Sequence, residues 1–210
     1  MKKAFVFFAV IVALLAIAVP RSDAYFTNIY LSAFQNIMWQ DKLTGEIYYD
    51  MGGENSYSYC VNPSVDMPVP GNYYAEQFSI AGNQNLLKVA WLMDNYGYSK
   101  FGAFPGFTAA ETGTIVQLAI YDLIGQPVAP VAGYDALFTK MNQLINSIPA
   151  TDLAYLSAEY KELAIYNNSD KGMAYQEVIT PVPVPAAVWL LGSGLIGLAG
   201  LRKKVSKLIT

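Results

Sequence analysis

Residues 56–61 read SYSYCV, a run rich in tyrosine, which favours β-strands. Residues 46–50, EIYYD, have the same character. The sequence between them, MGGEN, contains glycine and asparagine and indicates a connecting loop. The two runs therefore predict two β-strands, and Cys60 lies near the end of the second.

Helical signals follow farther along the chain, so strands are expected first and helices later. Asn83 or Asn85 is suited to cap a helix through residues 86–93, and Gly97 is a natural C-terminal stop. The apolar residues of this helix are nearly continuous, which indicates that the helix is largely buried.

The next helix has the clearest start signal. Residues 108–111, TAAE, match a capping box, and apolar residues continue at helical spacing to Leu123. Gln117 lies beside this apolar stripe. Two further helices are expected, over 134–148 and 151–166. The expected fold class is α+β, with N-terminal β-strands that carry Cys60 packed against a helical portion that carries Gln117.

The N-terminal end has the features of an export signal. Lys2 and Lys3 precede an apolar run over residues 4–19, and Ser22 and Ala24 supply small residues at a cleavage site. The alternative is a membrane anchor, but the run is shorter than the roughly 20 residues that a membrane span needs. We therefore expect a secretory signal peptide that is cleaved after Ala24.

Prolines recur near the other end of the chain, at Pro181, Pro183 and Pro185. Proline disfavours helix and favours extended structure, so these residues mark a boundary before the uncharged segment 186–201. That segment is marginally long enough to span a bilayer as a transmembrane helix, with basic residues on the cytoplasmic side. The basic cluster consists of Arg202, Lys203 and Lys204.

This order of a proline motif, an apolar helix and a basic cluster resembles the PEP-CTERM sorting signal. The resemblance implies recognition by an exosortase in the inner membrane of a Gram-negative bacterium, removal of the tail, and delivery to the cell surface or the exopolysaccharide matrix. Anchoring in the inner membrane would then be transient, and a permanent C-terminal anchor is the alternative. Valine at positions 182 and 184 stands where the family name has glutamate, which leaves the cleavage position open.

A signal peptide at 1–24 and a sorting tail at 181–210 leave residues 25–180 as one extracellular domain. This length is sufficient for a hydrophobic core. The domain holds six Lys and Arg against fifteen Asp and Glu, so its net charge is −9. Such a surface repels the phosphates of nucleic acids, and we expect no nucleic-acid partner.

The amino-acid types that are absent from the chain limit the catalytic and metal sites that it can form. It contains no histidine and one cysteine, Cys60. Catalytic Ser-His-Asp and Cys-His arrangements are therefore excluded, and we expect no metal site and no other cofactor. No spacing among the acidic residues nominates a carboxylate pair for glycoside hydrolysis. Since a lone cysteine cannot form an internal disulfide, Cys60 is an inert buried thiol, an intermolecular bridge or a reactive group.

Two short motifs carry a second resemblance. Residues 59–61, YCV, are followed 57 positions later by VQLAIYD at 116–122. This pair is similar to the paired motifs of bacterial thioester domains, which occur in Gram-positive adhesins and in some PEP-CTERM proteins. The resemblance covers roughly residues 57–123. It implies a bond between Cys60 Sγ and Gln117 Cδ, formed with loss of ammonia.

The thioester resemblance implies a single-use covalent trap rather than an enzyme. An amine on a partner would form an amide through Gln117 and release the Cys60 thiol. The partner would be an amine-bearing surface or matrix component, either a protein lysine or an amino sugar. Tyr59 and Tyr121 either line this site or are ordinary half-buried aromatics. The alternative function is a non-covalent structural or carbohydrate-binding matrix protein in which Cys60 is merely buried.

Overall fold

The computed structural model describes residues 27–39, 42–51, 54–62, 70–126, 128–166 and 174–182. The strands in this part of the chain are β1 (Thr27–Trp39), β2 (Lys42–Met51), β3 (Glu54–Cys60), β4 (Gly71–Ser79), β5 (Tyr160–Tyr166) and β6 (Ala174–Pro181). They form a closed antiparallel barrel in the order β1-β2-β3-β6-β5-β4. The helices are α2 (Gln84–Tyr96), α3 (Tyr98–Phe101), α4 (Ala109–Leu123), α5 (Asp135–Asn146) and the 3₁₀-helix η1 (Ala154–Ala158). The α+β class expected from the sequence is confirmed.

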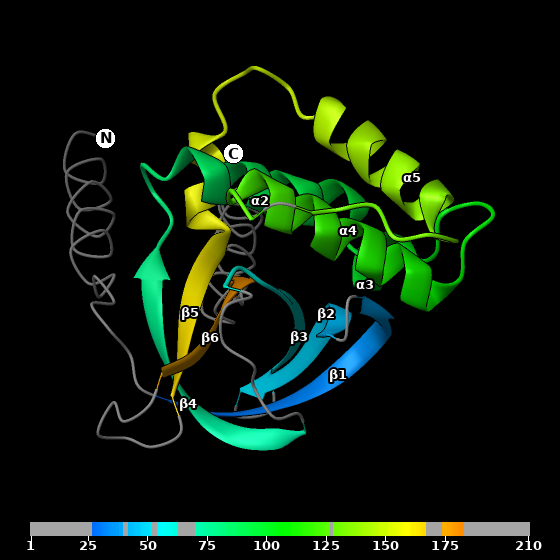
Figure 1. Cartoon of the computed structure of the whole chain (residues 1–210). Helices are drawn as coiled ribbons and strands as arrows, with labels where there is room; N and C mark the ends of the chain where they lie inside the picture. The colour runs from blue at the N-terminus through cyan, green and yellow to red at the C-terminus, as the bar shows by residue number, and fades with distance from the viewer. Residues whose placement is uncertain are drawn as a thin grey trace, which may run out of the picture.

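The helices gather on one side of the barrel (Figure 1). Helix α4 contacts β1, β2 and β3, and it also contacts α2 and α5, so it joins the sheet to the helical layer. A capping box sets its start. Thr108 Oγ1 accepts a hydrogen bond from Glu111 N–H at 3.2 Å, and Thr108 N–H donates to Glu111 Oε2 at 2.7 Å. The capping box expected from the sequence is confirmed.

Two hydrophobic clusters meet at β3. The first is built from strands around the barrel, and its buried members are Ile47, Cys60, Tyr73, Ala75, Leu163, Ile165 and Val178. The second lies between the sheet and the helices and contains Tyr59. Because successive side chains of a strand point to opposite faces, Tyr59 faces the helices and Cys60 faces the barrel interior.

The segment 151–166 differs from the helix expected from its sequence. Only Ala154–Ala158 is helical, as a 3₁₀-helix, and Tyr160–Tyr166 forms β5. Strand β5 pairs with β4 on one side and with β6 on the other, so it is needed to close the barrel. These long-range pairings override the local preference for a helix. The expected order of strands first and helices later is wrong for the same reason, since β5 and β6 follow the helices.

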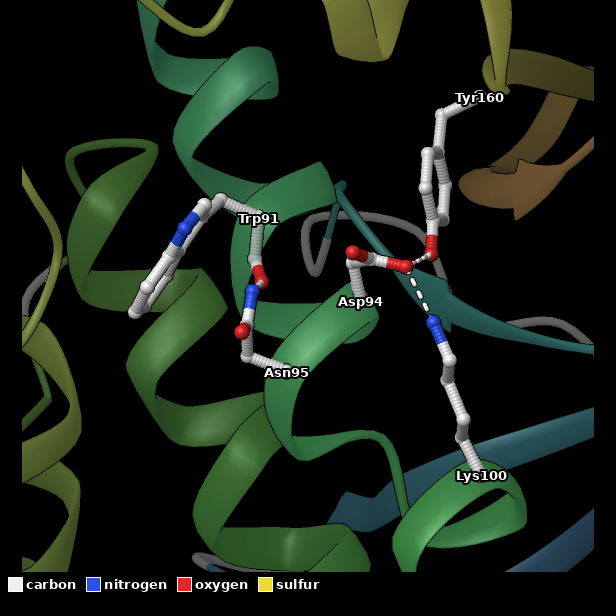
Figure 2. A network of polar contacts seen from close by, with 5 residues as sticks. All are labelled: Trp91, Asp94, Asn95, Lys100 and Tyr160. Atoms are coloured by element: carbon white, nitrogen blue, oxygen red, sulfur yellow. Dashed lines mark hydrogen bonds and ion pairs between the residues drawn. The ribbon is translucent and has the colours of Figure 1, made fainter. Parts of the chain in front are cut away.

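Asp94, near the end of α2, links three elements (Figure 2). Its carboxylate forms an ion pair with Lys100 of α3 and accepts a hydrogen bond from Tyr160 Oη of β5 at 3.5 Å. Burial raises the pKa of Tyr160, and the charge of Asp94 raises it further, so the phenol remains a neutral donor. In the same view, Asn95 Nδ2 donates to the Trp91 carbonyl at 2.9 Å within α2.

Glu46 of β2 ties α3 to the barrel from within the protein. Its side chain is fully buried, and Oε1 accepts a hydrogen bond from Ser99 N–H at 3.3 Å. The Tyr59 hydroxyl lies beside the same carboxyl group and accepts a hydrogen bond from Tyr98 N–H at 3.3 Å. Burial raises the pKa of Glu46, and its polar contacts with Ser99 and Tyr59 oppose this only in part.

Replacing Thr108 with alanine should destabilise the protein, because the first turn of α4 loses the side chain that caps it. We expect the free energy of unfolding to fall by about 1 kcal/mol, as is usual for a lost N-cap. Urea denaturation followed by circular dichroism measures this change. Thr151→Ala is a matched control, since Thr151 is exposed and lies outside every helix. Equal losses in the two variants would contradict a specific role for the cap.

Glu46→Gln should change how stability depends on pH. The pKa of Glu46 is raised above its ordinary value of 4.5, so folding favours the protonated form. The stabilising contribution is therefore complete below that ordinary value and is lost as the pH rises through the folded-state pKa. Since glutamine does not ionise, the variant should lose less stability than the wild type between mildly acidic and mildly alkaline pH. The urea concentration at the midpoint of unfolding, measured for both proteins at one mildly acidic and one mildly alkaline pH, tests this expectation.

The control for this experiment is Glu111→Gln. Hydrogen bonds from Thr108 lower the pKa of Glu111, so its contribution is present above the ordinary value and is lost as the pH falls. Between mildly acidic and mildly alkaline pH, Glu111→Gln should therefore keep the pH dependence of the wild type, and its deviation should appear only below the ordinary pKa of 4.5. A Glu46→Gln protein with the pH profile of the wild type would show that ionisation of Glu46 does not influence folding.

Candidate functional site

Cys60 and Gln117 meet in the structure although 57 positions separate them in the chain. Gln117 Oε1 accepts a hydrogen bond from the Cys60 backbone N–H at 2.8 Å, and Gln117 Nε2 donates to the Cys60 carbonyl at 2.7 Å. Both residues are buried, with 2% of Cys60 and 1% of Gln117 exposed. The residues singled out in the two sequence motifs are therefore direct neighbours.

The place that Gln117 occupies is created by the separation of β3 from β2. Val61 N–H donates to the Glu177 carbonyl, in β6, at 2.8 Å. Since backbone groups of successive residues point to alternate sides of a strand, the N–H and C=O of Cys60 point away from β6 and toward β2. The pairing of β2 with β3 runs no farther than Ile47 opposite Ser58. The carboxamide of Gln117 thus stands where a further residue of β2 would otherwise pair.

Thr114 satisfies a backbone group of β2 in the same way. Its Oγ1 donates to the Thr44 carbonyl at 2.7 Å, and both threonines are buried. Thr114 and Gln117 are three positions apart, so they lie on one face of α4. This face of the helix satisfies backbone groups of both strands at the point where the strands part.

These hydrogen bonds matter because the groups are removed from water. A buried backbone donor or acceptor without a partner costs about 1–3 kcal/mol. The carboxamide satisfies one donor and one acceptor of Cys60 at once. Gln117 therefore has a structural role whether or not it reacts, and Thr114 is a site residue that the sequence reasoning missed. The sequence carries no distinct signal for it, because α4 contains other polar residues, such as Thr112, and the partner of Thr114 is a backbone carbonyl.

The thiol of Cys60 faces an apolar environment. Its neighbours in the barrel cluster are aliphatic and aromatic side chains, among them Ile47, Tyr73 and Val178. Within the described residues, no group of histidine, cysteine and acidic side chains could hold a metal ion. The site therefore offers one sulfur nucleophile, one carboxamide carbon and one backbone N–H directed at the carboxamide oxygen.

The two tyrosines beside the motifs take different positions. Tyr121 lies one turn after Gln117, is half-buried, and packs against both hydrophobic clusters, including the one that holds Cys60. Tyr59 points to the helical side of β3. The pKa of Tyr59 is raised well above its ordinary value by burial and by the nearby charge of Glu46. A role for these tyrosines in lining the site remains a prediction.

The structure describes only the beginning of the expected sorting tail. Pro181 is the last residue of β6, opposite Tyr160 of β5, and Val182 N–H donates to the Glu159 carbonyl at 2.7 Å. The other tail residues, namely Pro183, Pro185, Arg202, Lys203 and Lys204, lie outside the described residues, as do the expected signal peptide and transmembrane helix. Of the helices that are described, none has the length and hydrophobicity needed to cross a bilayer.

The C-terminal segment of the chain matches a known sorting motif. The PEP-CTERM protein-sorting motif matches residues 181–204. No curated protein matches the sequence.

Solved structures share the fold. The chain is similar to the N-terminal thioester domain of a surface protein from Clostridium perfringens, with a TM-score of 0.50 and 13% identity, covering 73% of this chain and 97% of that one. A cysteine-to-alanine mutant of such a domain, also from Clostridium perfringens, gives a TM-score of 0.50 and 12% identity, with 74% and 99% covered. The N-terminal thioester domain of the fibronectin-binding protein SfbI from Streptococcus pyogenes gives 0.47 and 14%, with 79% and 97% covered.

At these identities the structural likeness establishes the fold alone, whereas the match at the C-terminus is to a motif that implies export to the cell surface. The chain carries a PEP-CTERM protein-sorting motif and has the fold of bacterial N-terminal thioester domains.

Proposed function

We propose that Cys60 and Gln117 form an internal thioester in the exported protein, and that this bond acylates an amine on a partner. The result is covalent adhesion or cross-linking at the cell surface or in the exopolysaccharide matrix. The observation that carries the proposal is the pair of hydrogen bonds that holds the carboxamide of Gln117 against the residue bearing the thiol. The fold shared with thioester domains of surface proteins supports it.

Bond formation needs three changes at this contact. Cys60 Sγ attacks Gln117 Cδ, the bond from Cδ to Nε2 breaks, and Nε2 leaves as ammonia with the thiol proton. The fold supplies proximity, which replaces an encounter between separate molecules. The Cys60 N–H that donates to Oε1 at 2.8 Å is directed at the atom on which negative charge develops during the attack.

The finished thioester would be protected and reactive at the same time. Burial of Cys60 and Gln117 excludes the water that would hydrolyse it. An amine that reaches Cδ displaces the sulfur, forms an amide through Gln117 and releases the Cys60 thiol. Each molecule reacts once, so the protein is a covalent binder and not an enzyme. A lysine of a protein or an amino sugar of the matrix supplies the amine.

The sorting motif supports this setting. Its proline segment begins at Pro181, directly where β6 ends, and the proposed basic end of the tail is formed by residues 202–204. An exosortase would process this tail after transient anchoring in the inner membrane. The mature product would be the domain 25–180, delivered to the outside without its signal peptide 1–24.

A second function is supported by a specific observation. The hydrogen bonds of Gln117 satisfy the buried backbone of Cys60, and they account for the buried glutamine without any chemistry. In that case the domain is a non-covalent structural or carbohydrate-binding component of the matrix, and Cys60 is part of its core.

The mass of the mature domain separates the two functions. The thioester predicts a mass that is lower than that of the sequence by one ammonia, because Nε2 has been expelled. Treatment with methylamine should add the mass of one methylamine to the thioester form, so that the product exceeds the sequence mass by one CH2 group, and it should expose a thiol that reacts with a maleimide. Electrospray mass spectrometry before and after treatment measures both changes.

Two variants serve as controls for the mass experiment. Cys60→Ala lacks the nucleophile, and Gln117→Glu keeps the length of the side chain but has no amide to expel. Neither variant should show the deficit. A wild-type protein of full mass, prepared without contact with amines or ammonium, would favour the non-covalent function.

Methylamine should also lower stability. A bond from Cys60 to Gln117 links residues 57 positions apart, and the chain-entropy estimate for such a cross-link gives roughly 4 kcal/mol of stabilisation. The thermal midpoint of the wild type should therefore fall when the bond is opened, whereas that of Cys60→Ala should not change. Differential scanning calorimetry measures this, and equal shifts in both proteins would mean that methylamine acts elsewhere.

A further inference from the structure

We propose that ammonia is a reversible ligand of the Cys60–Gln117 site: it enters the position vacated by Nε2, opens the thioester and restores the carboxamide. The ammonium concentration outside the cell then sets the fraction of molecules that carry the reactive bond. This inference rests on the proposed thioester. It is carried by the two hydrogen bonds that fix the carboxamide on Cys60.

The first step of the argument is that the site is shaped for the product of this reaction. Ammonia attacks Gln117 Cδ, the bond from Cδ to Sγ breaks, and one proton passes from nitrogen to sulfur. The products are the carboxamide and the thiol, and Oε1 and Nε2 again meet the N–H and C=O of Cys60 at 2.8 Å and 2.7 Å. Because this is the reverse of thioester formation, ammonia follows the path by which it left.

The second step distinguishes ammonia from alkylamines. An amide is planar, and the carboxamide of Gln117 directs Oε1 and one N–H of Nε2 to the same edge of β3. In a secondary amide of the ordinary trans form, the alkyl group occupies the position of that hydrogen. The adduct of an alkylamine therefore cannot keep both contacts with Cys60 unless it adopts the unfavourable cis form. Ammonia alone regenerates the arrangement that the structure shows.

The third step distinguishes ammonia from water. Hydrolysis would place a carboxylate where the carboxamide stands, and an oxygen would then face the Cys60 carbonyl, which now accepts a hydrogen bond from Nε2 at 2.7 Å. Two acceptors cannot form a hydrogen bond with each other. Because Cys60 and Gln117 are both buried, water does not satisfy these acceptors either. The Cys60 carbonyl thus favours a nucleophile that retains an N–H, and burial favours the smallest one.

The test is exchange of the side-chain nitrogen. The mature wild-type protein is incubated with ¹⁵N-labelled ammonium chloride, one portion is denatured in acid and digested while the salt is still present, and peptide mass spectrometry locates the label. We expect one labelled nitrogen at Gln117, together with loss of the ammonia deficit, and we expect the deficit to return as the salt is dialysed away. The exposed carboxamide of Gln143 is an internal control and should stay unlabelled.

Cys60→Ala should incorporate no label at Gln117. Because that variant could fold poorly, wild-type protein first treated with methylamine is a second control, and it should also take up no label. A protein that shows the ammonia deficit but takes up no label, or takes it up without reversal on dialysis, overturns the role of ammonia and leaves the thioester in place. A protein with neither deficit nor label overturns both proposals.

Discussion

The structure depends on one constraint, which is that the backbone of Cys60 must find hydrogen-bond partners after β3 separates from β2. The groups point away from β6 and are sealed from water. Gln117 meets this requirement, and Thr114 does the same for Thr44. Helix α4 must therefore cross the sheet at this point and in this rotation. Its capping box and its contacts with α2 and α5 hold it there.

In the proposed function the same contact would serve both structure and chemistry, and the free energies of the two roles can be compared. Conversion to a thioester removes the N–H that now satisfies the Cys60 carbonyl, which costs about 1–3 kcal/mol. The proposed bond would also close a long loop. The entropy that the unfolded chain loses would then stabilise the folded protein by roughly 4 kcal/mol. In the proposed thioester the N–H of Cys60 would still be directed at Oε1, as it is in the carboxamide. The stabilisation of the folded state by the cross-link would therefore exceed the cost of the lost hydrogen bond.

Local signals in the sequence were sufficient for part of this arrangement. Asn83, Gly97 and the Thr108–Glu111 box define helices through short-range contacts, and these elements were predicted correctly. The neighbouring positions of Cys60 and Gln117 followed from a motif resemblance. The pairing of strands across the barrel could not be predicted from the sequence, because β5 becomes a strand through partners that are far away in the sequence. Thr114 escaped notice because its partner is a backbone carbonyl, which no side-chain pattern reveals.

The candidate site and the start of the sorting motif lie on neighbouring strands. The sorting motif begins at Pro181, the last residue of β6, and β6 pairs with β3 so that Val178 lies opposite Cys60. In the proposed reaction the amine breaks the bond to Cys60, so a pull on the attached partner would enter at Gln117 and act on α4. The load would fall on the packing of α4 against β1, β2 and β3 on one side and against α2 and α5 on the other. The extent of these contacts on both sides of α4 would therefore resist displacement of the helix by a bound partner.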